Sequence, residues 1–211
     1  MNTRKHDTRW MVGVALMAAI VVVLANTPLG LIPLPMIKAT TTHIPVILGA
    51  ILFGPLAGGI LGAVFGICSM ISNTLTPAVL SFAFSPFLAT SVTGALKAVW
   101  VAVGCRAMIG IVSGWLWIAL KKLKVNDLAA LPVVGFVGSM TNTVFVMGSI
   151  YLLLRPEYAR AMGVAADAVF GLVLGVITGS SVLEAIVALV LVTAIGKALL
   201  RASASLFRRK A

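Results

Sequence analysis

Long apolar runs, separated by short polar or proline-rich stretches, are the feature that most constrains this chain. A helix needs roughly 20 apolar residues to cross about 30 Å of hydrocarbon. Only 10% of the residues are charged, against roughly 25% in an ordinary soluble domain. The sequence therefore predicts an all-α integral membrane protein, folded as a single domain over residues 1–211.

Six helices are predicted from the apolar runs and the breakers between them. They cover residues 9–26, 43–53, 55–72, 92–121, 128–154 and 168–200. Gly54 and Pro55 separate the second helix from the third, because proline is tolerated at the first position of a helix. The connections 27–42, 73–91 and 155–167 are rich in proline, which predicts loops or re-entrant segments.

The basic residues predict the orientation in the membrane, since cytoplasmic loops are enriched in Lys and Arg. With six spans, one side collects Arg4, Lys5, Arg9, Lys121, Lys122, Lys124, Lys197, Arg201, Arg208, Arg209 and Lys210. The opposite side holds only Lys38, Lys97, Arg155 and Arg160. This asymmetry predicts that both termini are cytoplasmic, and it explains the net charge of +11 without nucleic acid as a partner.

Catalytic and metal-binding patterns are missing from the sequence. It contains no phosphate-binding G-x-x-x-x-G-K-[ST] loop, no H-E-x-x-H, no C-x-x-C and no G-x-S-x-G. Cys68 and Cys105 both lie in apolar segments and are predicted to be buried free thiols. We therefore expect no enzyme, no cofactor and no metal site, and transport would need energy from another subunit.

Three charged or amide side chains stand out within predicted spans, where such groups are costly and mark functional sites. Arg106, Asn142 and Glu184 each stand 15 to 17 residues from a basic or acidic residue at the cytoplasmic end of their helix. At about 1.5 Å per residue all three lie roughly 22 to 26 Å from that end. They predict a shared outward-facing pocket, with Arg106 suited to a carboxylate or phosphate. The alternative is that Arg106 and Glu184 neutralise each other.

Hydroxyl, amide and imidazole groups cluster toward the same outer side. Thr41, Thr42 and His43 enter the second helix, Asn73 lies at the end of the third, and Thr141 neighbours Asn142. We expect these residues to complete a substrate site. For Thr42 and His43 the alternative is a capping role at the start of the helix that contains Pro45.

Small residues recur at a spacing of four, which allows helices to approach closely in lipid. One series is Gly54, Gly58, Gly62 and Gly66, and a second is Gly171, Gly175 and Gly179. Both predict packing within the bundle. Ala15 and Ala19 form a similar surface on the first helix, and that surface is predicted to face a partner.

Two short motifs resemble a known transporter family. Ile44-Pro45-Val46-Ile47-Leu48-Gly49 fits I-P-x-x-x-G, and Gly54-Pro55-Leu56-Ala57-Gly58 fits a G-P-x-x-G turn. With a proline-rich first loop before them, they resemble the substrate-binding S components of energy-coupling-factor (ECF) vitamin transporters. The length, helix number and orientation are similar over nearly the whole chain.

The resemblance implies high-affinity binding of one vitamin-like molecule in an outward pocket, for ATP-driven uptake across the bacterial plasma membrane. It implies a transmembrane coupling subunit and two cytoplasmic ATPases as partners, with Ala15 and Ala19 docking the coupling subunit. Thr41-Thr42-His43-Ile44-Pro45 and Arg106 are most similar to pantothenate-type proteins. A riboflavin or other vitamin type, a self-sufficient carrier or channel, and a small membrane enzyme stay open.

Overall fold

The chain forms a helical bundle with one short hairpin. The computed structural model describes residues 8–27, 30–33, 38–89 and 91–208. Arg4, Lys5, Arg209 and Lys210, which entered the charge argument, lie outside the described residues. The elements are α1 (Thr8–Ala25), β1 (Leu31–Pro33), β2 (Lys38–Thr40), α2 (His43–Phe53), α3 (Pro55–Leu75), η1 (Ser81–Ala83), η2 (Pro86–Leu88), α4 (Val92–Val99), η3 (Trp100–Gly104), α5 (Cys105–Lys122), α6 (Asp127–Leu153), α7 (Arg155–Met162), η4 (Ala166–Ala168), α8 (Val169–Thr178) and α9 (Ser180–Arg208).

Five helical segments of the described chain are long and apolar enough to cross a membrane. They are Thr8–Ala25, Pro55–Leu75, Val92–Lys122, Asp127–Leu153 and Ala166–Arg201. The predicted second helix is present as α2, but its 11 residues reach only about 16 Å at 1.5 Å per residue. By itself α2 is too short to cross.

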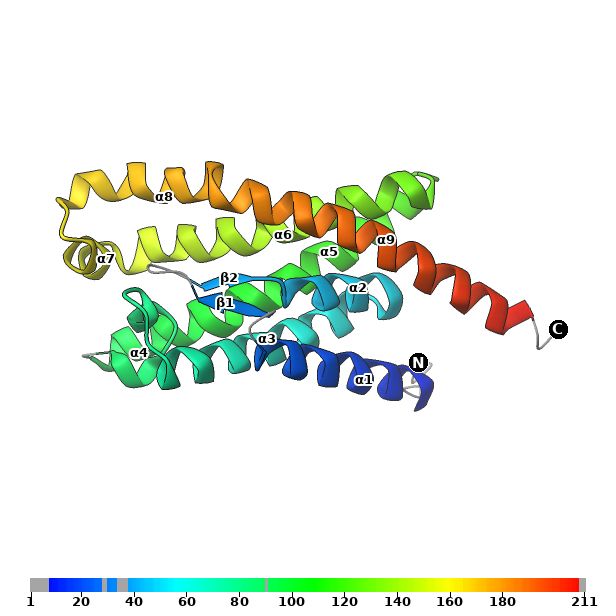
Figure 1. The fold of residues 1–211 in the computed structure, drawn as a ribbon, viewed down its shortest axis with the longest axis horizontal. Helices are drawn as coiled ribbons and strands as arrows, with labels where there is room; N and C mark the ends of the chain where they lie inside the picture. The colour runs from blue at the N-terminus through cyan, green and yellow to red at the C-terminus, as the bar shows by residue number, and fades with distance from the viewer. Residues whose placement is uncertain (1–7, 28–29, 34–37, 90, 209–211) are drawn as a thin grey trace, which may run out of the picture.

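The start of α1, the end of α5 and the end of α9 lie at one end of the bundle (Figure 1). The short helices α4 and α7 lie at the opposite end (Figure 1). The core follows from this arrangement, since α3 packs on α5, α6 packs on α9, and α2 contacts α3, α5 and α6. Apolar residues of α2 such as Val46, Ile47 and Ala50 are completely buried there.

The fold class is all-α as predicted, and the hairpin β1–β2 is a small addition to it, because the first connection contains two antiparallel strands of three residues each. Leu31 pairs with Thr40 and Pro33 with Lys38. The strands fit the local sequence, because Pro33 lacks the N–H that a helix interior requires. In Figure 1 the hairpin is drawn between the ribbons of α3 and α6.

Two predicted helices differ from regular α-helix. The segment over 92–121 is helical throughout, but residues Trp100–Gly104 adopt a π-helix, a form that occurs as single-turn bulges, frequently at functional sites. The predicted helix 168–200 is wrong as one continuous helix, because it breaks at Gly179 into α8 and α9. Gly179 has φ −93° and ψ −97°, so the backbone leaves the α conformation at this residue.

Glycines bring α3 and α5 into backbone contact, as the first small-residue series predicts. A Cβ atom on Gly62 would lie 2.2 Å from the Arg106 carbonyl oxygen, and one on Gly58 would lie 2.5 Å from that of Gly110. Gly66 meets the Ala102 carbonyl in the same way. Without side chains between them, the two backbones pack directly, and this contact fixes the position of Arg106 against α3.

The second series does not pack inside the bundle, which corrects that prediction. A Cβ atom on Gly171 or Gly175 would meet no heavy atom of the described chain within 4 Å. Both residues are exposed. The four-residue spacing is therefore the same in the two series, and only the tertiary arrangement separates a packed series from an open one.

We expect Gly62→Ala to lower thermal stability strongly, because the added methyl group would overlap the Arg106 backbone. Overpacking costs typically about 1–3 kcal/mol. Gly175→Ala is the matched control, since alanine is favoured over glycine in a helix by up to about 1 kcal/mol. The melting temperatures of the two variants in detergent test this. Equal effects would show that the α3–α5 contact is not tight.

Candidate functional site

Arg106 is a buried cation held between two aromatic rings. Only 4% of its surface is exposed, and its guanidinium carbon lies 4.8 Å from the centre of the Phe65 ring and 5.1 Å from that of Phe84. Each ring face attracts a cation electrostatically. The rings thus compensate part of the cost of keeping this charge out of water.

The π-helix supplies hydrogen-bond acceptors to the same guanidinium. Arg106 Nη1 donates to the carbonyl oxygens of Ala102 and Val101 at 3.1 and 3.3 Å. Arg106 Nε has no partner among the described residues. The side chain is therefore fixed in orientation, while one of its donors stays unused.

No carboxylate neutralises Arg106 within the described part of the chain. The ion pairs found there are Lys121–Asp127 and Arg155–Asp167. Pairing of Arg106 with Glu184, the alternative to a ligand site, is therefore not present in this structure. A buried charge without a counter-ion is costly, and an anionic ligand would remove that cost.

His43 lies in the same neighbourhood as Arg106. The ring is 1% exposed, and the charge of Arg106 acts on it electrostatically. Its Nδ1 atom lies 3.4 Å from Thr40 Oγ1, whereas Nε2 is buried and has no partner among the described residues. The imidazole therefore has one nitrogen held by the hairpin and one available.

Helical geometry brings Asn142 to the same region. A Cβ atom on Gly138 of α6 would touch both Ser113 of α5 and Ile47 of α2, so the three helices meet at that level. One helical turn from Ile47 and from Gly138, toward the end of the bundle that holds α7, the same faces of α2 and α6 carry His43 and Asn142. Arg106 lies two turns from Ser113 along α5, toward the same end. Asn142 is 8% exposed, and its Oδ1 atom has no partner among the described residues.

Glu184 reaches the site through the hairpin. The Thr41 N–H donates to the Gly30 carbonyl at 3.1 Å, so the next pair, Leu31 and Thr40, is not hydrogen-bonded across the ladder. The Thr40 N–H is therefore directed away from β1, and it hydrogen-bonds to the Glu184 carboxylate. Thr40 thus links Glu184 on α9 with His43 on α2.

The remaining predicted residues bond mainly to the protein itself. Thr42 is fully buried, and its hydroxyl donates to the Gly30 carbonyl at 2.9 Å rather than capping α2. Thr41 is partly buried beside it. The Thr141 hydroxyl donates to the Val137 carbonyl one turn earlier at 2.7 Å. The threonines therefore shape the hairpin and α6 next to the site.

Asn73 holds the loop that carries Phe84. Its amide nitrogen donates to the Ser69 carbonyl at 2.8 Å, and its oxygen accepts a hydrogen bond from the Ser81 hydroxyl at 2.7 Å. The Ser81 carbonyl in turn accepts from the Phe84 N–H at 3.0 Å. In this structure Asn73 therefore positions an aromatic wall of the Arg106 site.

The sequence did not reveal Phe65, Phe84 or Ser113 as neighbours of the site. Phenylalanine in an apolar run is indistinguishable from a lipid-facing residue, and no pattern marks the π-helix. Ser113 could have been noticed as a hydroxyl inside a span. Its oxygen is buried and has no partner among the described residues, like that of Asn142.

Two other predictions concern residues outside the site. Ala15 and Ala19 are exposed on α1, so a partner can reach them. Cys68 and Cys105 are free thiols, with Cys105 buried and Cys68 partly buried. In the described residues no group of three His, Cys, Asp or Glu side chains could hold a metal ion.

Two cavities lined by described residues lie at the ends of the bundle rather than around Arg106. One, of about 200 Å³, lies by η2, α4 and α7, and its lining includes Ser91 just before α4, together with Glu157 and Arg160. The other, of about 280 Å³, lies between the start of α6 and the later part of α9.

Asn142 and Asn73 should respond differently to substitution by leucine. Asn142→Leu removes a buried atom without a partner, so the ligand-free protein should keep its melting temperature or gain stability, while ligand affinity falls. Asn73→Leu removes the acceptor of the buried Ser81 hydroxyl proton and should cost about 1–3 kcal/mol of stability. Thermal unfolding without ligand, followed by ligand titration, measures both. A large loss of stability in Asn142→Leu would contradict an available site.

Comparison with known proteins shows the family of the chain. Residues 9–196 match the family described as "ECF transporter, substrate-specific component". The chain is also 33% identical over 172 residues to the pantothenic acid transporter PanT of Lactococcus lactis subsp. cremoris, a match that covers 81% of each protein.

These matches confirm the resemblance seen in the sequence motifs. They show that the chain is a transporter component and not an enzyme. Family membership implies a vitamin substrate and association with an ECF module. The apolar helices make the chain a multi-pass protein of the bacterial cell membrane. The chain belongs to the family of substrate-specific components of ECF transporters.

Proposed function

We propose that this chain binds pantothenate with high affinity and delivers it for ATP-driven uptake. The observation that carries the proposal is Arg106, a buried guanidinium with two aromatic neighbours and no carboxylate partner among the described residues. Such a group favours an anion over a neutral or cationic ligand. The similarity to a pantothenic acid transporter supports the same ligand.

The polar groups of pantothenate match the unsatisfied atoms of the site. Its carboxylate would accept hydrogen bonds from Arg106, including the unused Nε donor. Its hydroxyl and amide groups would donate to Asn142 Oδ1 and interact with His43 Nε2, both of which lack partners among the described residues. Hydrogen bonds to the protein would then replace the hydrogen bonds to water that each ligand group loses on entering a buried site.

The surrounding predicted residues would complete the site. We assign Thr41, Thr42 and Thr141 to the wall formed by the hairpin and α6, and Asn73 to the support of the Phe84 loop. Glu184 would hold the hairpin over the bound ligand through the Thr40 N–H. Opening of this hairpin would then expose the site.

For the assembly we propose one domain of six spans with both termini in the cytoplasm. The hairpin and the short α2 together would form the second passage. The start of α1 and the end of α9 at the same end of the bundle are consistent with an even number of passages (Figure 1). Ala15 and Ala19 would dock a transmembrane coupling subunit, which two cytoplasmic ATPases would drive.

A titration of the purified protein with pantothenate, riboflavin, folate, biotin and thiamin tests the ligand. Binding is measured by tryptophan fluorescence or calorimetry. The expected result is stoichiometric binding of pantothenate and of none of the other four vitamins. Binding of riboflavin instead would overturn pantothenate as the ligand, but the chain would still be a vitamin-binding component of a transporter. Uptake into liposomes should require the coupling module, and flux without it would indicate a self-sufficient carrier.

Arg106→Ala should weaken binding of pantothenate by about 30-fold or more, because truncating one partner of a buried charge pair costs roughly 2–5 kcal/mol. A neutral amide analogue should lose much less affinity, and its retained binding shows that the variant is folded. Arg160→Ala, an exposed arginine on α7, is the control and should bind as the wild type does. Equal losses for acid and amide would make Arg106 structural.

A further inference from the structure

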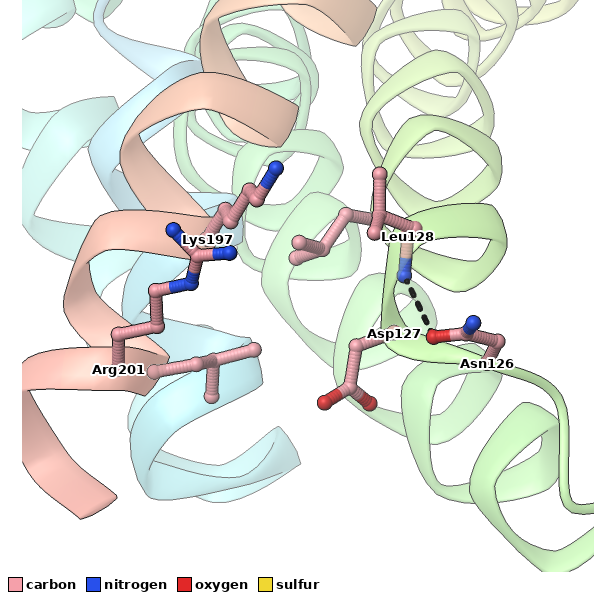
Figure 2. Close-up of a pocket in the computed structure, with 7 residues that line it drawn as sticks. Asn126, Asp127, Leu128, Lys197 and Arg201 are labelled. Atoms are coloured by element: carbon pink, nitrogen blue, oxygen red, sulfur yellow. Dashed lines mark hydrogen bonds between the residues drawn. The ribbon is translucent and has the colours of Figure 1, made fainter.

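A second basic site lies at the end of the bundle where α5 ends. The cavity of about 280 Å³ between α6 and α9 is lined by Asn126, Asp127, Leu128, Leu131, Lys197, Leu200 and Arg201. Figure 2 shows Lys197 and Arg201 on α9 across the gap from Asp127 and Leu128 on α6. We propose that this cavity binds the phosphate headgroup of an anionic phospholipid.

The described residues do not balance the charge of the cavity. Asp127 forms an ion pair with Lys121, which lies outside the cavity lining. Neither ion pair of the described chain includes Lys197 or Arg201. The cavity thus contains two cations and one carboxylate that another lysine already neutralises. An anionic group entering between Lys197 and Arg201 would receive two charge-assisted interactions.

Part of the lining is apolar, which favours a lipid over a free anion. Leu128, Leu131 and Leu200 contribute leucine side chains beside the two cations. Leu128 is 55% exposed on a helix that is long enough to cross the membrane. A phospholipid offers this combination, with a charged phosphate above a glycerol and acyl chains.

The position of the cavity in the fold agrees with this occupant. It lies at the ends of two membrane-crossing segments, Asp127–Leu153 and Ala166–Arg201. Lysine and arginine at such a position extend their charged groups toward the membrane surface, and basic pockets between transmembrane helices bind anionic lipid headgroups. The volume is close to the lower limit of roughly 300 Å³ for ligand sites, which suits a headgroup.

Lipid titration of the full chain tests the proposal. The protein is purified in detergent, stripped of lipid, and titrated with phosphatidylglycerol or phosphatidylcholine, and bound lipid is counted by native mass spectrometry. We expect phosphatidylglycerol to bind about tenfold more tightly. The double variant Lys197→Gln with Arg201→Gln should lose about tenfold of that affinity, the equivalent of about 1.4 kcal/mol.

The matched control removes two charges at the same end of the bundle but outside the cavity. Lys122→Gln with Lys124→Asn serves this purpose, because both lysines are exposed and asparagine tolerates the positive φ of 58° at position 124. This control should retain phosphatidylglycerol affinity within about twofold. If the first double variant does not fold, the exposed Arg201→Gln alone should still lose about threefold.

Several outcomes would overturn the proposal. Equal losses in the two double variants would indicate general surface charge, and equal binding of both lipids would exclude anion recognition. Competition by glycerol phosphate at similar concentrations would assign the cavity to a free phosphate compound. Unchanged lipid affinity with lost binding to the coupling module would make it a protein contact. Vitamin binding is independent of all these results, so failure here leaves the pantothenate proposal standing.

Discussion

Direct contact between the backbones of α3 and α5 is the constraint on which the rest of the site depends. Gly58, Gly62 and Gly66 leave no side chain between the helices, and in lipid such close packing replaces the hydrophobic force that drives folding in water. The contact holds the π-helix and Arg106 against α3, so that Phe65 lies under the guanidinium. The geometry of the candidate site is therefore set by glycines that do not touch a ligand.

The site itself combines strong local order with unsatisfied groups. Arg106 has ring faces and carbonyl oxygens around it, yet Nε has no partner among the described residues. His43 is held on α2 and Asn142 on α6, and each has one buried polar atom without a partner among the described residues. A pre-arranged set of unsatisfied groups can recognise a small polar anion without large rearrangement of the helices, because the cost of ordering them is already met on folding.

Particular residues show how far the sequence could predict this arrangement. Arg106 and Asn142 were identifiable, because a charge or amide in an apolar run has few structural reasons to be there. Phe65 and Phe84 were not, since aromatic residues are common on lipid-facing surfaces as well. Glu184 was expected beside Arg106, but in the structure it hydrogen-bonds to the hairpin, and strand pairing over three residues leaves too weak a pattern to predict.

The sequence by itself determined that the chain lies in a membrane, where the long apolar segments run, and which family it belongs to, because apolar length and short motifs are local properties. Tertiary structure decided which glycine series packs, where α8 gives way to α9 at Gly179, and that Arg106 has no carboxylate partner among the described residues. These outcomes depend on contacts between segments far apart in the chain. Spacing along one helix does not contain that information.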